Sequence, residues 1–65
     1  MGQRLRGLRE EKQMSHAQLA EVLGTGRTTI INWEKDRRKP SHEMIVKICG
    51  IYNCTADYLL GIKEF

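Results

Sequence analysis

Apolar side chains recur every three or four positions along this chain, which is the spacing of amphipathic α-helices. No stretch alternates between apolar and polar residues for long enough to indicate a β-strand. The pattern therefore predicts an all-α fold of five helices in a single domain spanning residues 1–65. The helices are expected over about 3–13, between Ser15 and Gly24, over 27–35, between Ser41 and Asn53, and after Thr55, where a short fifth helix holds Tyr58, Leu59 and Leu60.

Residues that satisfy free backbone groups mark the ends of the second helix. Ser15 and Gln18 have the spacing of a capping box, in which each side chain bonds a free amide at the start of a helix. Gly24 is expected to end this helix, because glycine readily adopts the left-handed backbone conformation. The chain then turns sharply through residues 25 and 26 into the third helix.

The third predicted helix has two unlike faces. A helix turns by about 100° per residue, so Ile30 and Trp33 fall on one side of it and point inward. The opposite side is polar apart from Ile31, a large apolar group that the buried face does not explain. This outer face comprises Arg27, Thr28, Ile31, Asn32 and Lys35.

Composition narrows the possible functions. A chain of 65 residues is too small for a deep catalytic cleft, so a surface function is expected. Hydrophobic residues make up 40% of the chain and charged residues 29%, which suits a globular domain and argues against disorder. Most of the positive charge behind the net charge of +3 lies in residues 1–12 and 27–39. This distribution indicates an anionic partner.

Membrane and export signals are absent from the sequence. No apolar run approaches the ~20 residues of a membrane helix, and the N-terminus lacks the apolar stretch of a signal peptide. We therefore expect a cytoplasmic protein with no membrane partner. Cys49 and Cys54 allow a disulfide by count alone, but without an export signal they are interpreted as reduced, buried, small apolar groups.

Catalytic and metal sites are not expected. Cys49, Cys54 and His16 lack the close pairing of zinc ligands. Ser15 and Ser41 already have capping roles, and the sequence has no paired carboxylates or other catalytic constellation. The chain is therefore predicted not to be an enzyme and to hold no metal, cofactor or small-molecule ligand.

Three stretches of the sequence together resemble a known family. They are "LRGLREEKQMSHAQLAEVLG", "TTIINWEKDRRKPS" and "ADYLLG", and the match covers Leu5 to Leu60, nearly the whole chain. On these residues the chain resembles the helix-turn-helix family of phage Cro and cI repressors and the related Xre-type bacterial regulators. The resemblance implies a compact five-helix lambda-repressor-like DNA-binding domain, with the helix-turn-helix at about residues 16–35.

The resemblance also implies a function. The chain is expected to be a sequence-specific DNA-binding transcriptional regulator, in the first place a repressor, that binds a roughly palindromic operator in the major groove as a homodimer. The alternative is a protein-interaction module or an antitoxin-type co-regulator that uses the same fold. Such a module needs the core but not the polar face of the third helix, so that face favours DNA. The chain is either a whole Cro-like protein or the DNA-binding head of a longer repressor.

Structural roles follow from the same resemblance. Arg9 and Glu34 are expected to form a partly buried ion pair that clamps the first helix to the third. Three positions depart from the family pattern: Thr25 replaces an apolar residue, Gly26 a serine that caps the third helix, and His16 a glutamine that often holds a phosphate. The predicted core anchors are Leu19, Ala20, Gly24, Ile30 and Trp33.

The outer face of the third helix is where bases are expected to be read. Asn32 has the donor and acceptor spacing for adenine and is the favoured base reader. Arg27 suits either guanine or a phosphate, and Thr28 suits either the thymine methyl or a phosphate. Ile31 is explained by an apolar contact to the C5 methyl of thymine, which is accessible only from the major groove. The alternative is that Ile31 is an exposed isoleucine with no role in binding.

Contacts to the DNA backbone are expected on either side of that face. The basic run after it is interpreted as a set of phosphate clamps, the alternative being a solvated loop. His16 lies at the start of the second helix, where free amides favour a phosphate, and the alternative is an ordinary exposed histidine. The predicted phosphate-binding residues are Ser15, His16, Lys35, Arg37, Arg38 and Lys39.

A homodimer is expected because one module of this size buries only ~600–1,000 Å² on DNA and should bind weakly alone. Two recognition helices related by a two-fold axis meet successive major grooves about 34 Å apart. The candidate dimer contacts lie near the C-terminal end, beyond the core of the last two helices. They are Tyr58, Ile62 and Phe65.

Overall fold

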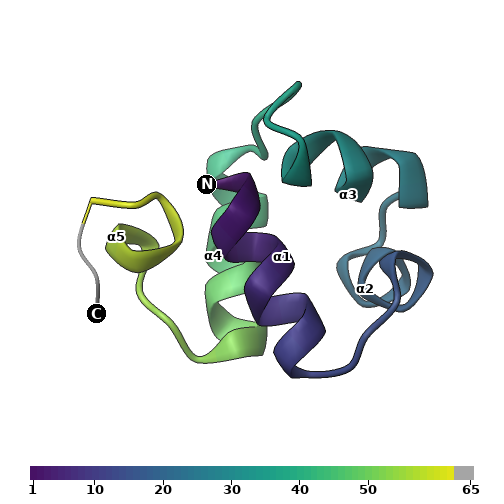
Figure 1. The fold of residues 1–65 in the computed structure, drawn as a ribbon, viewed down its shortest axis with the longest axis horizontal. Coiled ribbons are helices and arrows are strands. Elements are labelled where there is room, and N and C mark those ends of the chain that lie inside the picture. The colour runs from purple at the N-terminus through teal and green to yellow at the C-terminus, as the bar shows by residue number, and fades with distance from the viewer. Residues whose placement is uncertain (63–65) are drawn as a thin grey trace.

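Five α-helices follow one another in the computed structural model, which describes residues 1–62 (Figure 1). Within these residues no strand occurs, so the predicted all-α fold is confirmed. Three boundary predictions were wrong. Gln13 lies outside the first helix with a left-handed φ of 57°, and Lys35 and Leu60 are the C-caps of the third and fifth helices. The helices are α1 (Gly2–Glu11), α2 (His16–Leu23), α3 (Arg27–Glu34), α4 (His42–Tyr52) and α5 (Ala56–Leu59).

Capping interactions explain where α2, α4 and α5 begin. Ser15 Oγ accepts the amide of Gln18 at 3.0 Å and Gln18 Oε1 accepts the amide of Ser15 at 2.7 Å, so the predicted capping box is confirmed. The hydroxyl oxygens of Ser41 and Thr55 accept amides at the starts of α4 and α5. Asn53 ends α4 with a left-handed φ of 52°, as its residue type predicts.

The helices are arranged around α1 and α4, which occupy the middle of the fold (Figure 1). The pair α2 and α3 lies at one end, and α5 lies at the other. α2 packs against both α3 and α4, while α1 contacts α3 and α5. Helices α1 and α2 therefore support α3, and the C-terminal part of the chain stands apart from it.

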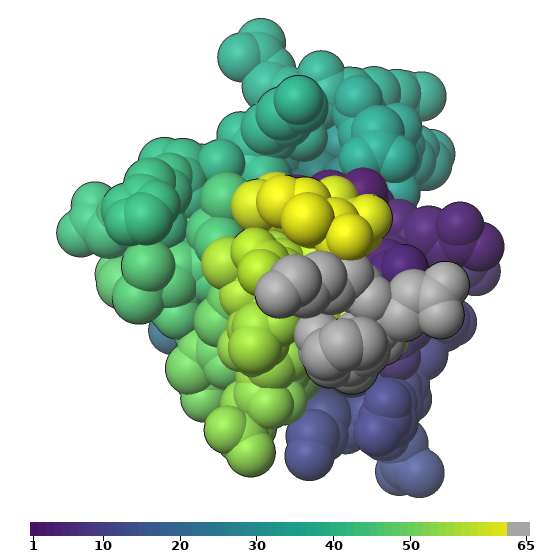
Figure 2. All heavy atoms as spheres, turned by 90° about the vertical axis from the view of Figure 1, so that its left-hand side faces the viewer, coloured from purple at the N-terminus to yellow at the C-terminus, as the bar shows by residue number. Residues whose placement is uncertain are grey.

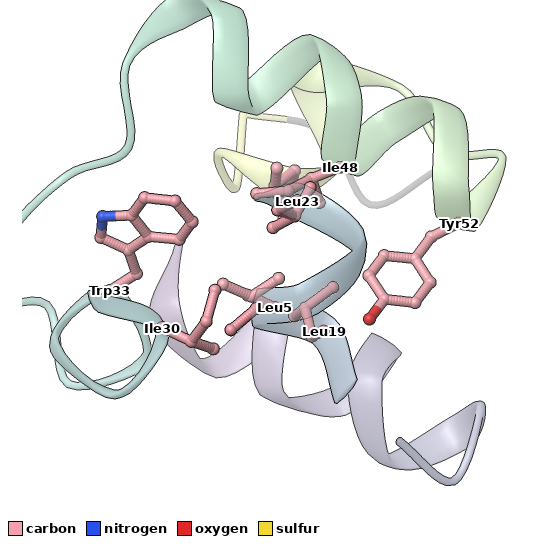
Figure 3. Close-up of a cluster of buried hydrophobic side chains, with 9 residues drawn as sticks. Leu5, Leu19, Leu23, Ile30, Trp33, Ile48 and Tyr52 are labelled. Atoms are coloured by element: carbon pink, nitrogen blue, oxygen red, sulfur yellow. The ribbon is translucent and has the colours of Figure 1, made fainter. Parts of the chain in front are cut away.

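The core takes one fully buried side chain from every helix. These five side chains have 0% exposure, and Figure 3 shows several of them converging with Leu23, Trp33 and Tyr52. Because burial of one such side chain stabilises a fold by about 1.5–3 kcal/mol, no helix can detach without a large loss. The five are Leu5, Leu19, Ile30, Ile48 and Leu59.

One predicted core anchor does not lie in the core. Leu19, Ala20, Ile30 and Trp33 are buried at 5% exposure or less, but Gly24 is exposed. Gly24 is the C-cap of α2, with a left-handed φ of 72° that residues with a Cβ adopt at a cost. Its role is therefore to turn the chain between α2 and α3, as the helix-end prediction stated, and not to fill space.

The first turn of α1 packs against the last turn of α3 at very close range. Gly2 is buried there, and a Cβ added to it would lie 2.6 Å from the carbonyl carbon of Glu34 and 2.7 Å from the carbonyl oxygen of Trp33. The amide of Gly2 donates to Asp36 Oδ1 at 3.0 Å, so a residue just beyond α3 caps α1. This contact fixes the end of α3 relative to the rest of the fold.

Candidate nucleic-acid interface

The outer face of α3 is a mostly exposed surface of polar side chains. Arg27, Thr28 and Lys35 are exposed and Asn32 is half-buried, while Ile30 and Trp33 hold the opposite face in the core. Within residues 1–62 the side chains of Arg27, Thr28, Asn32 and Lys35 make no hydrogen bond or ion pair. Their donors and acceptors are therefore free to bind a partner.

The turn before α3 presents the start of this helix to solvent. Gly26 is the N-cap, in an extended conformation with no side-chain cap, and its carbonyl oxygen accepts the amides of Thr29 and Ile30. The amides of Arg27 and Thr28 remain without an intrahelical partner, as at any helix start. The replacement of a capping side chain by glycine thus leaves this end of α3 open.

A basic loop continues from the C-terminal end of α3 and rises above it in Figure 1. Asp36 has a left-handed φ of 57°, and the amide of Arg37 then donates to the carbonyl oxygen of Asn32 at 2.9 Å. This bond ties the loop to α3. The side chains of Arg37, Arg38 and Lys39 are exposed and have no partner within residues 1–62.

Beneath α3, Arg9 and Glu34 form a bidentate ion pair. Arg9 Nε donates to Glu34 Oε2 at 2.7 Å and Nη2 donates to Oε1 at 3.2 Å, with the two side chains only 10% and 6% exposed. Nη1 donates to the carbonyl oxygen of Met14 at 2.7 Å. The hydrogen bond to Glu34 raises the pKa of Arg9 above its ordinary value despite burial. The pair that the resemblance implied is present and joins α1 to α3.

His16 is a third member of this cluster, which the sequence did not reveal. Its Nε2 lies 3.1 Å from Glu34 Oε1, and its side chain is 33% exposed. Glu34 therefore binds residues of both α1 and α2 from the end of α3. Ser15, its neighbour, accepts the Gln18 amide but keeps its own hydroxyl proton for an outside acceptor. No spacing along the chain links positions 16 and 34, so sequence analysis had no signal for this contact.

Ile31 is half-buried and not simply displayed to solvent. It lines a surface cavity of about 340 Å³ between α1, α2 and α3. The other residues of its walls are charged or titratable, so Ile31 is the one apolar side chain that lines it. The lining residues are Arg6, Arg9, His16, Ile31, Glu34 and Lys35.

The predicted dimer contacts lie away from α3. Tyr58 is half-buried, and the guanidinium of Arg4 lies 4.7 Å from its ring centroid. Ile62 is 68% exposed, while Phe65 lies outside the described residues. Figure 2 shows the last described residues, in yellow, between α1, in purple, and the loop after α3, in teal. A second cavity of about 200 Å³ opens there, with Leu60, Ile45 and Pro40 among its walls.

The sequence pattern of the helix-turn-helix domain matches residues 2–62. The chain belongs to the helix-turn-helix domain family. It is 34% identical over 64 residues to the HTH-type transcriptional regulator ImmR of Bacillus subtilis (strain 168), and 30% identical over 60 residues to the repressor protein C2 of Salmonella phage P22. The resemblance to phage repressors and Xre-type regulators is thereby confirmed. The matches cover 98% and 92% of this chain but only 50% and 28% of those relatives.

The fold of this helix-turn-helix domain is similar to a solved repressor structure. The P22 c2 repressor protein, crystallised in complex with synthetic operator 9T in the presence of Tl+, gives a TM-score of 0.84 at 28% sequence identity. The similarity covers 89% of this chain and 88% of that chain. The predicted five-helix repressor-like fold is therefore confirmed, with α2 and α3 as the helix-turn-helix pair.

Neither a membrane-spanning helix nor a metal-binding cluster occurs in residues 1–62. None of the helices in residues 1–62 is long and apolar enough to cross a membrane. Over the same residues, no three His, Cys, Asp or Glu side chains are grouped so that they could hold a metal ion.

Proposed function

We propose that this chain is the DNA-binding domain of a transcriptional regulator, acting as a repressor, that reads its operator in the major groove. The observation that carries the proposal is the outer face of α3, whose polar side chains have no partner within residues 1–62. A major groove is about 12 Å wide and admits one α-helix. The similarity to a repressor crystallised on an operator supports the same function.

Base reading is assigned to the first two turns of α3. Asn32 is the reader of an adenine, whose N6 and N7 match the donor and acceptor of its side-chain amide. Arg27, in the first turn, reaches guanine or a flanking phosphate, and Thr28 reaches the thymine methyl or a phosphate. Ile31 supplies an apolar contact to a thymine methyl, because its side chain is only half-buried on the same face.

Phosphate contacts are assigned to the two flanks of α3. The exposed loop residues Arg37, Arg38 and Lys39, with Lys35, place positive charge beyond its C-terminal end. On the other flank, the hydroxyl of Ser15 can still donate its proton to a phosphate. The Nε2 atom of His16 lies against Glu34, so His16 contacts a phosphate with the other edge of its ring.

A homodimer completes the proposal, because a lone module of this size binds DNA weakly. The surface best suited to the dimer contact includes Ile62 and Leu60, which are 68% and 42% exposed at the C-terminal end of the described chain. Tyr58 lies two positions before Leu60 and is half-buried, with the guanidinium of Arg4 4.7 Å from its ring centroid. Two-fold symmetry would place the two α3 helices on half-sites one helical turn apart, and a dimer over a promoter would exclude polymerase.

Selection of bound sequences from a random duplex pool, at two salt concentrations, tests this function. We expect enrichment of an inverted repeat with half-sites about one helical turn apart. Salt-sensitive binding with no enriched sequence would overturn sequence reading and leave the outer face of α3 as a surface for a protein partner. Enrichment of a single half-site would contradict the proposed homodimer but leave the proposed base reading by α3 in place.

Asn32→Ala is expected to weaken binding to the selected site by ~1–3 kcal/mol, which is roughly 5- to 150-fold, and to change binding to random DNA little. The reason is that the substitution removes a base contact and no charge. Arg38→Ala, the matched control, removes a phosphate contact. It should weaken binding to both DNAs alike and lower the slope of log affinity against log salt by ~0.9.

Fluorescence anisotropy titrations of both variants, on both DNAs over a series of salt concentrations, measure these effects. Equal losses on selected and random DNA for Asn32→Ala would remove Asn32 from base reading. An unchanged salt slope for Arg38→Ala would remove Arg38 from the phosphate contacts.

A further inference from the structure

Cys49 and Cys54 lie on either side of the turn that ends α4. Asn53, between them, has a left-handed φ of 52°, and the amide of Cys54 donates to the carbonyl oxygen of Cys49 at 3.1 Å. The amide of Asn53 donates to the same carbonyl oxygen, and in helix ends that turn in this left-handed way the residues at the positions of Cys49 and Cys54 frequently bring their side chains together. Standard backbone lengths then keep the two Cα atoms within about 7 Å, close to the range that a disulfide spans.

The two thiols interact with each other. Burial, the charge of Cys49 and a hydrogen bond between the two side chains raise the pKa of Cys54 to about 11. Both cysteines are free and only half-buried, at the edge of the core. A raised pKa lowers the fraction of Cys54 present as thiolate near neutral pH, so Cys49 is taken as the sulfur that reacts first with an outside reagent.

We propose that Cys49 and Cys54 are a redox-active dithiol, which closes to an intramolecular disulfide by exchange with a small disulfide such as glutathione disulfide. The Cys49 thiolate attacks one sulfur of the small disulfide, forms a mixed disulfide and releases one small thiolate. Cys54 then loses its proton and attacks the sulfur of Cys49, which releases the second small thiolate. The protein is oxidised by two electrons, and the small disulfide is reduced to two thiols.

The second step is favoured by the same geometry. Once Cys49 carries the mixed disulfide, its sulfur is uncharged and no longer a thiol, so the charge and the thiol hydrogen bond that helped to raise the pKa of Cys54 are lost. The attacking sulfur is already adjacent, so ring closure is an intramolecular reaction at high effective concentration. The resulting bond would span the junction between α4 and α5, where Tyr52 also donates its hydroxyl to the sulfur of Met14 at 3.5 Å. The proposal does not depend on DNA binding.

Mass spectrometry of the full chain after equilibration in glutathione redox buffers and acid quenching tests the proposal. The wild type should lose two hydrogen masses and both free thiols while remaining a single chain, with no mixed disulfide accumulating. Cys54→Ser should accumulate one glutathionyl group, because its second step is blocked. Cys49→Ser should react roughly tenfold more slowly, since burial still holds the pKa of Cys54 high.

Several outcomes would overturn the proposal. They are oxidation that appears only as links between chains, thiols that react only after unfolding in urea, or equal rates for the two serine variants. Circular dichroism checks that each variant is folded. If a variant is not, phenylarsine oxide gives a second test on the wild type, because a trivalent arsenical bonds two neighbouring thiols. One equivalent should block both cysteines, and a requirement for two equivalents would contradict the proposed pair.

Discussion

Glu34→Ala is expected to lower the free energy of unfolding by about 3–5 kcal/mol. The Glu34 carboxylate is 6% exposed and accepts two hydrogen bonds from Arg9, so its removal leaves a guanidinium buried with only the carbonyl oxygen of Met14 as a partner. His16 loses its partner as well. A domain of 65 residues has a total stability of about 3–10 kcal/mol, so the variant should be largely unfolded or close to it.

Urea unfolding followed by far-ultraviolet circular dichroism measures this loss. The matched control is Glu10→Ala, which breaks the ion pair between Arg6 and Glu10 on the surface of α1. These side chains are 64% and 56% exposed and 3.5 Å apart, so the control should cost less than about 0.5 kcal/mol. Similar losses in the two variants would mean that burial of the Arg9 pair has no energetic consequence.

Much of the local structure could be predicted because its causes lie within a few residues of one another. Ser15 and Gln18 form their capping box, Asn53 turns the chain, and Ile30 and Trp33 fall on the buried face of α3. Each of these follows from helix periodicity or from a side chain that bonds a nearby amide. Family resemblance added the long-range pair of Arg9 and Glu34, which periodicity could not supply.

The contacts that could not be predicted depend on how the helices cross one another, and the spacing of residues along a single helix carries no information about the crossing. His16 reaches Glu34 because the start of α2 lies beside the end of α3. Asp36 accepts the amide of Gly2 because the start of α1 lies beside the end of α3. Gly24 was predicted both to end the second helix and to be a core anchor, and only the first role is confirmed, because it is an exposed C-cap in the left-handed conformation. The base and phosphate roles assigned to the outer face of α3 stay predictions.

Gly2→Ala is expected to lower the free energy of unfolding by about 3 kcal/mol, at the upper end of the cost of overpacking. The added Cβ would meet the backbone of Trp33 and Glu34 at distances that real Cβ atoms do not adopt. Backbone atoms cannot rotate away, so either α1 shifts from α3 or its first turn unwinds. Both responses weaken the hydrogen bond from the Gly2 amide to Asp36. Thermal and urea unfolding measure the loss.

Gly7→Ala is the matched control, because it makes the same substitution in the same helix. Nothing lies within 4 Å of a Cβ at Gly7, which is exposed, so alanine should stabilise the domain by about 0.5–1 kcal/mol through its higher helix propensity. The two variants are therefore expected to change stability in opposite directions. If Gly2→Ala were also stabilising, the close crossing of α1 and α3 at Gly2 would be wrong, and the ion pair between Arg9 and Glu34 would have to hold the end of α3 to α1.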